Sequence, residues 1–133
     1  MNRRKMWSGN SPVTTAVFNE GTTMEHLEIM QQIEFSRAKQ VRKKLIASEH
    51  LVAELVCYEP GQATVPHLHP RQDEIFYVIE GTGTIVVGEE EVRVSAGSVV
   101  YGPSGVRHGI RADAGDRMAL MFIKGPGSPG VPG

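Results

Sequence analysis

The chain has 133 residues, 40% of them hydrophobic, which is enough for one domain with an apolar core and too little for two. Its 14 Lys and Arg nearly balance 15 Asp and Glu, with a pI near 6.5, so it lacks the basic excess that binding to a nucleic-acid backbone requires. The single cysteine, Cys57, excludes an intramolecular disulfide and, inside an apolar run, is expected to be a buried hydrophobic residue.

The N-terminal region carries no recognisable targeting signal. Met-Asn-Arg-Arg-Lys is not followed by an apolar run, and no stretch of the chain approaches the length of a membrane span. We therefore expect a cytoplasmic protein with neither a membrane nor a nucleic-acid partner. Residues 1–23 are polar and contain Gly9, Pro12 and Gly21, and we interpret them as a flexible leader or as an arm that packs on a partner subunit.

The next segment gives a mixed signal. A capping-box spacing is followed by apolar residues at helical intervals, so we predict a short helix near residues 24–34. Leu27 and Ile29 also alternate as in a strand, which leaves that alternative open. The residues that carry the helical pattern are Thr22, Glu25, Leu27, Met30 and Ile33.

A basic stretch follows at residues 37–44. Because the net charge of the chain is close to zero, a nucleic-acid patch is not supported, and we interpret the stretch as the solvated face of a strand or helix. Its five cationic residues are Arg37, Lys39, Arg42, Lys43 and Lys44.

From about residue 40 the pattern is typical of short β-strands. Apolar or alternating runs rich in Val and Ile are each closed by Gly or Pro, which favours an all-β barrel or sandwich. We place one barrel domain at residues 24–124, and we expect the Gly- and Pro-rich residues 125–133 to form a disordered tail. The expected strands are Leu51–Tyr58, Ala63–Leu68, Ile75–Ile79, Thr84–Val87, Glu91–Val94, Ser98–Tyr101, Val106–Arg111 and Met118–Ile123.

Two histidines separated by one residue, His67 and His69, indicate a candidate metal site. In a strand, residues i and i+2 point to the same face, so both imidazoles would enter one side of the sheet. Along an unbroken strand, the odd spacing from His69 to Glu74 would send the carboxylate to the opposite face. Pro70 and the polar residues after it instead predict a turn, after which the chain pairs back antiparallel and Glu74 faces both histidines across a hairpin.

A third candidate ligand is His108, which lies in a later expected strand after the turn at Pro103–Gly105. The other two histidines, His26 and His50, have no such context, and we interpret them as hydrogen-bonded structural residues. A His-x-His pair alone is a weak signal. The case for a metal site therefore depends on the glycines and prolines around the histidines.

Those residues carry a family resemblance. The segment Gly61–Gly81, GQATVPHLHPRQDEIFYVIEG, resembles the first motif of the cupin superfamily, in which Gly, His-x-His, Glu and Gly recur at fixed spacing. The segment Gly97–His108, GSVVYGPSGVRH, resembles the second motif and fills its positions as far as the histidine. The family motif ends in a structural Asn four residues later, where this chain has Ala112, so the departure leaves the ligand set intact.

The resemblance implies a cupin jelly-roll β-barrel, or double-stranded β-helix, of about six to eight strands and usually a homodimer. It implies one divalent transition metal in the barrel mouth, held by His67, His69, Glu74 and His108. Such nitrogen and oxygen ligands suit Fe, Mn, Ni, Zn or Cu, and ligand identity alone does not select one. Pairing of two subunits would also cover the sheet edges that a small barrel leaves exposed.

Face alternation predicts what else lines the barrel. Phe76 and Val78 share the face of Glu74, and the residues on the face of His108 include Ile110, so the ligand pocket is expected to be largely apolar. For any one of these residues, simple filling of the barrel is the better interpretation. The last strand offers either Met118, Leu120 and Phe122 or Ala119 and Met121, and Arg107 and Arg111 are expected to point outward.

Two functional classes follow from an open metal site. The first is a small metal-dependent oxygenase, isomerase or cyclase that acts on a small oxygen-bearing molecule in the barrel mouth, with Glu74 as a candidate catalytic proton acceptor. The second is a non-catalytic barrel that binds or senses a metal or metabolite. A structural barrel that binds metal adventitiously is a third, blander alternative. The absence of an evident effector segment favours the enzyme.

Overall fold

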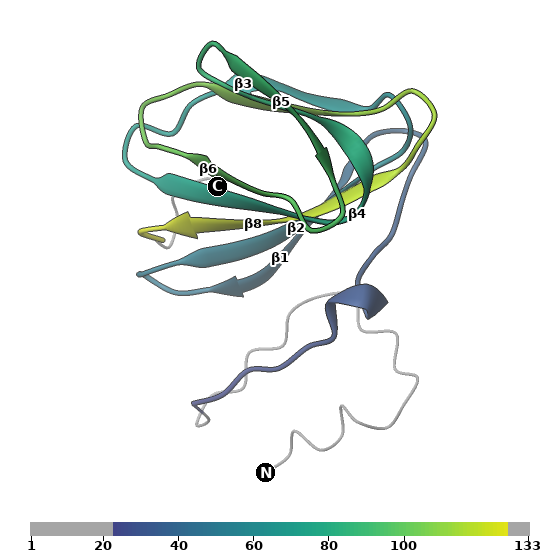
Figure 1. The fold of residues 1–133 in the computed structure, drawn as a ribbon. Coiled ribbons are helices and arrows are strands. Elements are labelled where there is room, and N and C mark those ends of the chain that lie inside the picture. The colour runs from purple at the N-terminus through teal and green to yellow at the C-terminus, as the bar shows by residue number, and fades with distance from the viewer. Residues whose placement is uncertain (1–22, 128–133) are drawn as a thin grey trace.

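The computed structural model describes residues 23–127, and this part of the chain consists of eight strands and one turn of 3-10 helix (Figure 1). The all-β fold class is thereby confirmed. The elements are η2 (Ile29–Gln31), β1 (Val41–Ala47), β2 (Val52–Tyr58), β3 (Ala63–His67), β4 (Asp73–Val87), β5 (Glu90–Ser95), β6 (Val99–Gly102), β7 (His108–Ala112) and β8 (Met118–Gly125).

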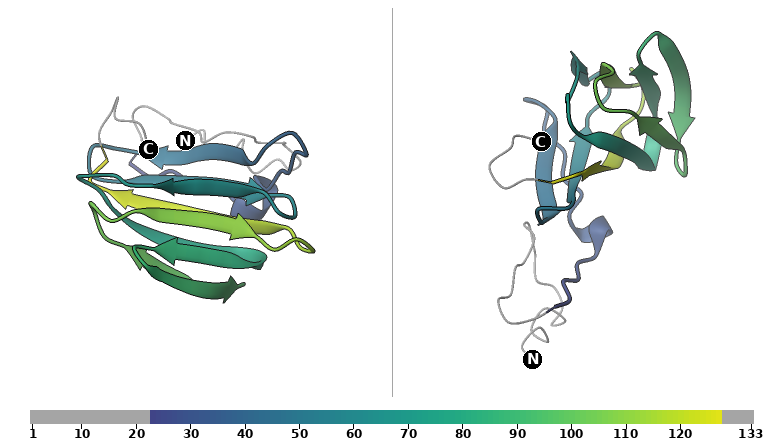
Figure 2. Two further views of the ribbon diagram at one scale, coloured as in Figure 1. Left: turned by 90° about the horizontal axis from the view of Figure 1, so that it is seen from above. Right: turned by 90° about the vertical axis from the view of Figure 1, so that its left-hand side faces the viewer.

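The strands form two facing layers that share β4. The hydrogen-bonded order is β1-β2-β8-β4-β7-β3, and β5 and β6 also pair with β4. Residues 73–81 of β4 pair with β8, and residues 82–87 pair with β5, so one strand passes from the first layer into the second (Figures 1 and 2). All pairings are antiparallel, which gives the jelly-roll curvature expected of the barrel.

Gly81 lies where β4 changes layers. Its φ is +89°, and a Cβ at this position would lie 1.7 Å from the carbonyl oxygen of Arg117. Only glycine permits both the positive φ and this approach of the two backbones. The sequence predicts two strands here, at 75–79 and 84–87, separated by glycines. That prediction is wrong, because residues 73–87 form one strand that bends at Gly81 and has a register shift at residues 78–80.

The main core fills the space between the two layers. It contains Phe76 and Val78 of β4 and Ile110 of β7, the inward residues expected from face alternation. Of the two sets possible for β8, the inward one is Met118, Leu120 and Phe122. These side chains are almost completely buried. The full cluster is Val56, Tyr58, Phe76, Val78, Ile85, Val94, Ile110, Ala112, Met118, Leu120 and Phe122.

A second apolar cluster lies on the outer face of the first layer. Leu45, Leu55 and the buried thiol of Cys57 belong to it, and the segment that contains η2 packs against it through apolar residues (Figure 2). The helix predicted near residues 24–34 is therefore replaced by an extended segment with one 3-10 turn. Packing of alternating apolar side chains onto the sheet outweighs the helical spacing. The packed residues include Leu27, Ile29, Ile33 and Phe35.

Strand β1 was absent from the sequence-based prediction. Its residues 41–47, VRKKLIA, contain three consecutive cationic side chains. These belong to the stretch 37–44, which was interpreted as the solvated face of a strand or helix. The interpretation fails for Lys43, which is largely buried beside Glu34, whereas Arg42 is exposed and pairs with Glu54. The bulge between Lys44 and Ile46 keeps both Leu45 and Ile46 on the outer apolar cluster.

The predicted ends of the domain fall partly outside the described residues. The leader 1–23 is described only at residue 23, and the predicted tail 125–133 only as far as residue 127, so both stay predictions. At that end, Gln72 donates a hydrogen bond to the carbonyl of Pro126. Within residues 23–127, no helical segment has the length and apolar character that a membrane crossing would require.

Replacement of Gly81 by Ala tests whether the bend in β4 depends on close backbone approach. Gly97 is a matched position because its φ is +94° but no atom would lie within 4 Å of a Cβ added there. We expect Gly97→Ala to lower the free energy of unfolding by about 1–3 kcal/mol through backbone strain alone. Gly81→Ala should lower it by more, since β4 and the Arg117 carbonyl must also separate. Urea denaturation measures both, and equal losses would contradict the role assigned to Gly81.

Candidate metal centre

The four predicted ligands come from both layers of the barrel. His67 ends β3 and is the register partner of His108 at the start of β7. His69 lies in the following loop, and Glu74 enters from β4. The predicted β3–β4 hairpin is wrong: β3 pairs with β7, whereas the start of β4 pairs with β6 and β8. Glu74 therefore approaches the histidines across the interior, because the loop between β3 and β4 crosses from one layer to the other.

The three predicted histidines are brought together. One ring nitrogen from each of His67, His69 and His108 lies within 4.8 Å of the others. The ring centroids are 4.9 Å apart for His67 and His69 and 4.6 Å apart for His67 and His108. Imidazole nitrogens at this separation can converge on a single transition-metal ion.

Glu74 lies against two of these imidazoles. Its Oε2 is 3.0 Å from Nε2 of His69 and 3.4 Å from Nε2 of His108, and its side chain is 1% exposed. A cluster of three ring nitrogens and one buried carboxylate is therefore present. Whether Glu74 acts as a fourth ligand stays a prediction.

Unsatisfied polar atoms support a metal at this position. Within residues 23–127, both carboxylate oxygens of Glu74 and both ring nitrogens of His108 are buried without a hydrogen bond of good geometry. Burial of such groups without partners is unfavourable by about 1–3 kcal/mol each. A divalent cation would satisfy several of them at once, so the donor set fits a metal.

Neighbouring groups hold the imidazoles in place. Nδ1 of His67 is 3.0 Å from the carbonyl oxygen of Val65, and donation of a hydrogen bond there leaves Nε2 available to a metal. The ring of Phe76 lies 5.2 Å from the ring of His108 and 5.0 Å from that of Phe122. Packing against Phe76 of the main core thus restrains the orientation of the His108 ring.

Two main-chain amides of the turn before His108 hold the segment that carries His69 and Asp73. The amide of Gly105 donates a hydrogen bond to the carbonyl of His69, at 2.9 Å. The amide of Ser104 donates to Oδ1 of Asp73, at 2.8 Å. Gly105 has a φ of +77°. The turn that contains Gly105 and precedes His108 is therefore in direct contact with the loop that carries His69.

Burial shifts the proton equilibria of the cluster. Desolvation, reinforced by the positive charge of Lys124, lowers the pKa of His69 to about 4. Desolvation and the neighbouring imidazoles lower the pKa of His108 to about 4. Desolvation raises the pKa of Glu74 to about 7, although Lys124 and Arg42 oppose the rise. Neutral imidazoles, the form that binds metal, are therefore favoured at neutral pH.

Two further sequence-based assignments concern residues outside the cluster. Arg107 and Arg111 are exposed, as face alternation predicts. His26 and His50 lie beside Glu28 and Glu49 and are not part of the cluster.

Sequence reasoning missed three charged groups inside the barrel. The interior is not wholly apolar, because Arg42, Glu54 and Lys124 interact there. The signal was present: Glu54 interrupts an apolar run, and Lys124 continues the inward alternation of Leu120 and Phe122. A charged residue on an otherwise buried face indicates a paired or functional group.

Comparison with known protein families gives one match. The sequence pattern described as cupin domain matches residues 54–124, more than half of the chain. The chain also resembles the Thermus thermophilus protein TT1209, whose crystal structure it matches with a TM-score of 0.74 and 28% identity, over 77% of this chain and 98% of that one.

Two sequence relatives come from Streptomyces. An uncharacterised protein of Streptomyces coelicolor is 40% identical over 57 residues, which is 43% of this chain and 54% of the relative. The tetracenomycin polyketide synthase protein TcmJ of Streptomyces glaucescens is 31% identical over 70 residues, 53% of this chain and 47% of the relative. The matched region thus spans about half the length of each relative.

The pKa shifts predict how pH affects the stability of chelator-treated protein. His69 and His108 have folded pKa values of about 4, below the ordinary 6.5, so the unfolded chain binds more protons between these values and stability falls as pH is lowered. Glu74 opposes this trend, because its folded pKa of about 7 exceeds the ordinary 4.5 and its contribution is lost as pH rises. Two histidines outweigh one carboxylate, so we expect a loss of about 3 kcal/mol from pH 6.5 to 4.

A variant separates these contributions. In His108→Gln, one histidine and one carboxylate remain and nearly cancel, so the stability should change little over the same pH range. His50→Gln, an exposed control, should behave as wild type. Urea denaturation at several pH values in the presence of a chelator measures the effect. An acid-dependent loss as steep in His108→Gln as in wild type would contradict the assignment.

Proposed function

This chain belongs to the cupin domain family, and on that premise we propose that it is a small metal-dependent enzyme acting on an oxygen-bearing small molecule. The observation that carries the proposal is the buried cluster of three imidazoles and one carboxylate with unsatisfied polar atoms. His67, His69 and His108 would hold one divalent transition metal, with Glu74 as the fourth ligand. Iron, manganese, nickel, zinc and copper are all compatible with this ligand set.

The residues around the cluster suit chemistry on a bound oxygen atom. A metal held there would act as a Lewis acid on that oxygen or activate dioxygen. With no metal bound, burial raises the pKa of Glu74 to about 7, so a Glu74 carboxylate that leaves the metal could accept a proton near neutral pH. Phe76 and Phe122 limit access of water from the core side. Oxygenase, isomerase and cyclase reactions all use these capacities.

The relative TcmJ suggests the kind of substrate. Its name assigns it to a polyketide synthase, and polyketides are chains and rings rich in carbonyl and hydroxyl groups. Such groups provide the one or two metal-binding oxygens that a largely apolar barrel with one bound metal ion would select. We therefore propose a ketone, enol or phenol as the substrate class.

The alternative is a non-catalytic barrel that binds a metal or metabolite. It would require the same cluster but no proton transfer by Glu74. The two proposals differ in turnover alone, so the decisive experiment must measure both metal binding and reaction.

Metal content and oxygen uptake test the proposed function together. Wild-type protein, grown with iron, manganese, nickel and zinc available, should carry about one equivalent of metal by elemental analysis. His67→Ala and His108→Ala each remove one ligand and should lower metal affinity tenfold or more. Oxygen consumption and product formation should then be followed for the loaded protein with catechols, flavonols, thiols and keto-enols.

The two proposals give different results. The enzyme proposal expects turnover of at least one compound class, with Glu74→Gln losing turnover more than it loses metal. Metal binding without turnover on the whole panel would favour the binding barrel. A wild-type protein without stoichiometric metal would contradict both, and His50→Ala serves as the control that should retain metal.

We also propose a homodimer, supported by an apolar patch on the outer face of β4 and β6. Ile75 pairs with Tyr101 and Tyr77 with Val99 across these strands, and the four side chains are 39–64% exposed. Neighbouring strand β8 adds Met121 and Ile123 to the same rows. A continuous patch of this kind on a small domain is typical of a protein interface.

A single charge in this patch tests the dimer. Val99→Glu would place a carboxylate among apolar side chains, so sedimentation equilibrium should change from about twice 14.5 kDa to near 14.5 kDa. Val65→Glu is the matched control, because Val65 is an exposed valine on β3, in the other layer of the barrel. A wild-type protein that sediments as a monomer would contradict the proposal.

A further inference from the structure

Three charged side chains form a connected group inside the barrel, which we call the inner ion cluster. Oε1 of Glu54 accepts a hydrogen bond from Nη1 of Arg42 at 2.8 Å and lies 3.0 Å from Nζ of Lys124. Lys124 is 1% exposed and the side chain of Glu54 is also buried. Two cations therefore share one carboxylate oxygen, which leaves the cluster with a net positive charge.

Strand register places the inner ion cluster beside the metal centre. Lys124 of β8 is the cross-strand partner of Glu74 of β4, and both side chains are buried on the same face. On the other side of β8, Glu54 of β2 is the cross-strand partner of Phe122, whose ring packs against Phe76.

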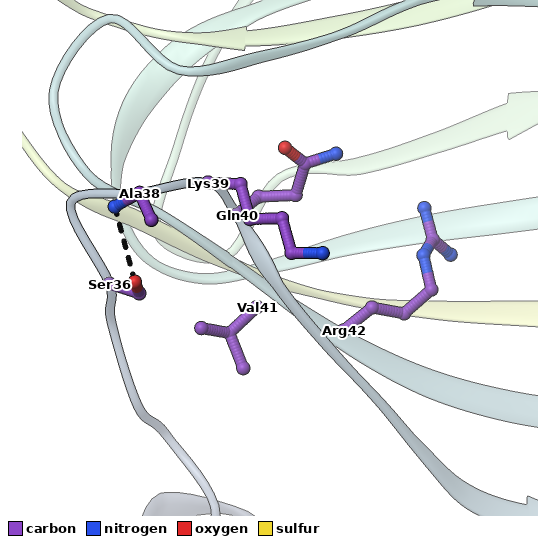
Figure 3. A pocket seen from close by; sticks show the side chains of 6 residues that line it. All are labelled: Ser36, Ala38, Lys39, Gln40, Val41 and Arg42. Carbon is purple, nitrogen blue, oxygen red and sulfur yellow. Dashed lines mark hydrogen bonds between the residues drawn. The ribbon is translucent and has the colours of Figure 1, made fainter.

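Arg42 connects the inner ion cluster with solvent. Its side chain is 36% exposed and lines a hollow of about 540 Å³ formed by residues 36–42. Figure 3 shows Gln40 and Arg42 pointing to one side of the chain and Val41 to the other. The hollow follows the start of β1, which is an end strand in the sheet order. Arg42 is thus the member of the inner ion cluster that lines this hollow, whereas Lys124 is the member paired with Glu74.

The charge balance indicates the kind of ligand that this arrangement accepts. Arg42 and Lys124 balance the carboxylates of Glu54 and Glu74, so a bound divalent cation would leave the interior positively charged. A lysine has three N–H donors and a guanidinium five, and the ion pairs with Oε1 of Glu54 use one of each. Further donors therefore remain for an anionic oxygen, which is bound most strongly by charged donors.

We infer that the inner ion cluster is a subsite for an anionic oxygen of the ligand, whose second oxygen reaches the metal centre. The inference rests on the proposed function, and it narrows the substrate class to small organic anions with two neighbouring oxygens. A 2-oxo carboxylate and the enolate of a 1,3-dicarbonyl compound share this chemistry. Arg42 binds the entering anion and Lys124 fixes its oxygen beside Glu74.

A solely structural role accounts less well for the arrangement. Buried ion pairs contribute little to stability compared with well-packed apolar residues. Lys43, the neighbour of Arg42, is an ion-paired lysine on the outer face of the same sheet, where its ammonium group contacts the carbonyl of Gln32 and the carboxylate of Glu34. Lys43 therefore has the same chemistry without access to the barrel interior, and it provides a matched control.

Binding of three small probes to Co(II)-loaded protein tests the subsite. Pyruvate represents the carboxylate, acetylacetone the enolate, and methyl pyruvate a neutral analogue of similar shape. Calorimetry and the visible absorption of the cobalt ion measure binding without any need for turnover. Wild type should bind pyruvate or acetylacetone at least tenfold more tightly than methyl pyruvate. Arg42→Gln and Lys124→Met should each weaken anion binding about 10- to 100-fold, while methyl pyruvate binding and metal content stay unchanged.

The variants keep the test decisive. Lys124→Met leaves Glu54 with only one partner and risks misfolding, whereas Arg42→Gln changes a partly exposed group and should fold. Lys43→Met should bind all probes as wild type does. Unaltered anion binding in Arg42→Gln, or no preference of loaded wild type for either anion, would overturn the subsite alone. A wild type that takes up no metal would overturn the proposed function and the subsite with it.

Discussion

The passage of β4 through both layers is the constraint on which the candidate site depends. The strand brings Glu74 in from the first layer at its start, and its last residues pair with β7, the strand that begins at His108. The bend at Gly81 therefore sets how far the carboxylate lies from the imidazoles. One continuous strand carries Glu74 and also pairs with the strand that begins at His108. The backbone, rather than flexible side chains, therefore fixes the position of the cluster.

A polar cluster of this kind opposes folding unless it is occupied. The carboxylate oxygens of Glu74 and the ring nitrogens of His108 are buried without a hydrogen bond of good geometry, and burial of such a group is unfavourable by about 1–3 kcal/mol. The barrel tolerates them because the first layer is covered by apolar side chains on both faces, inside by the main core and outside by the segment around η2. Stability comes from the sheet and its two clusters, and the interior is thereby free to hold charged and unsatisfied groups.

Local pattern predicted what depends on alternation, and failed where distant segments decide. The inward face of β4 and the burial of Cys57 followed from residues near each other in the sequence. The hairpin was wrong, because β3 pairs with β7, a strand far along the chain, and not with the strand that follows it. Strand β1 was missed because Arg42 is paired by Glu54, and that partner is invisible in a local window. Alternation along a strand predicts which face of the sheet a side chain lies on, whereas the order of the strands decides which side chain lies beside it.

The bonds from Gly105 to His69 and from Ser104 to Asp73 bear on how fast the centre can exchange its ion. The two amides of one turn bind the His69 carbonyl and the Asp73 carboxylate, so the conformational entropy of both segments is lost when the barrel forms and not when a cation arrives. Uptake then needs little rearrangement of the backbone and can approach the rate at which the aqueous ion sheds its water. Selection among ions would in that case reflect cellular supply more than the time needed to assemble the ligands.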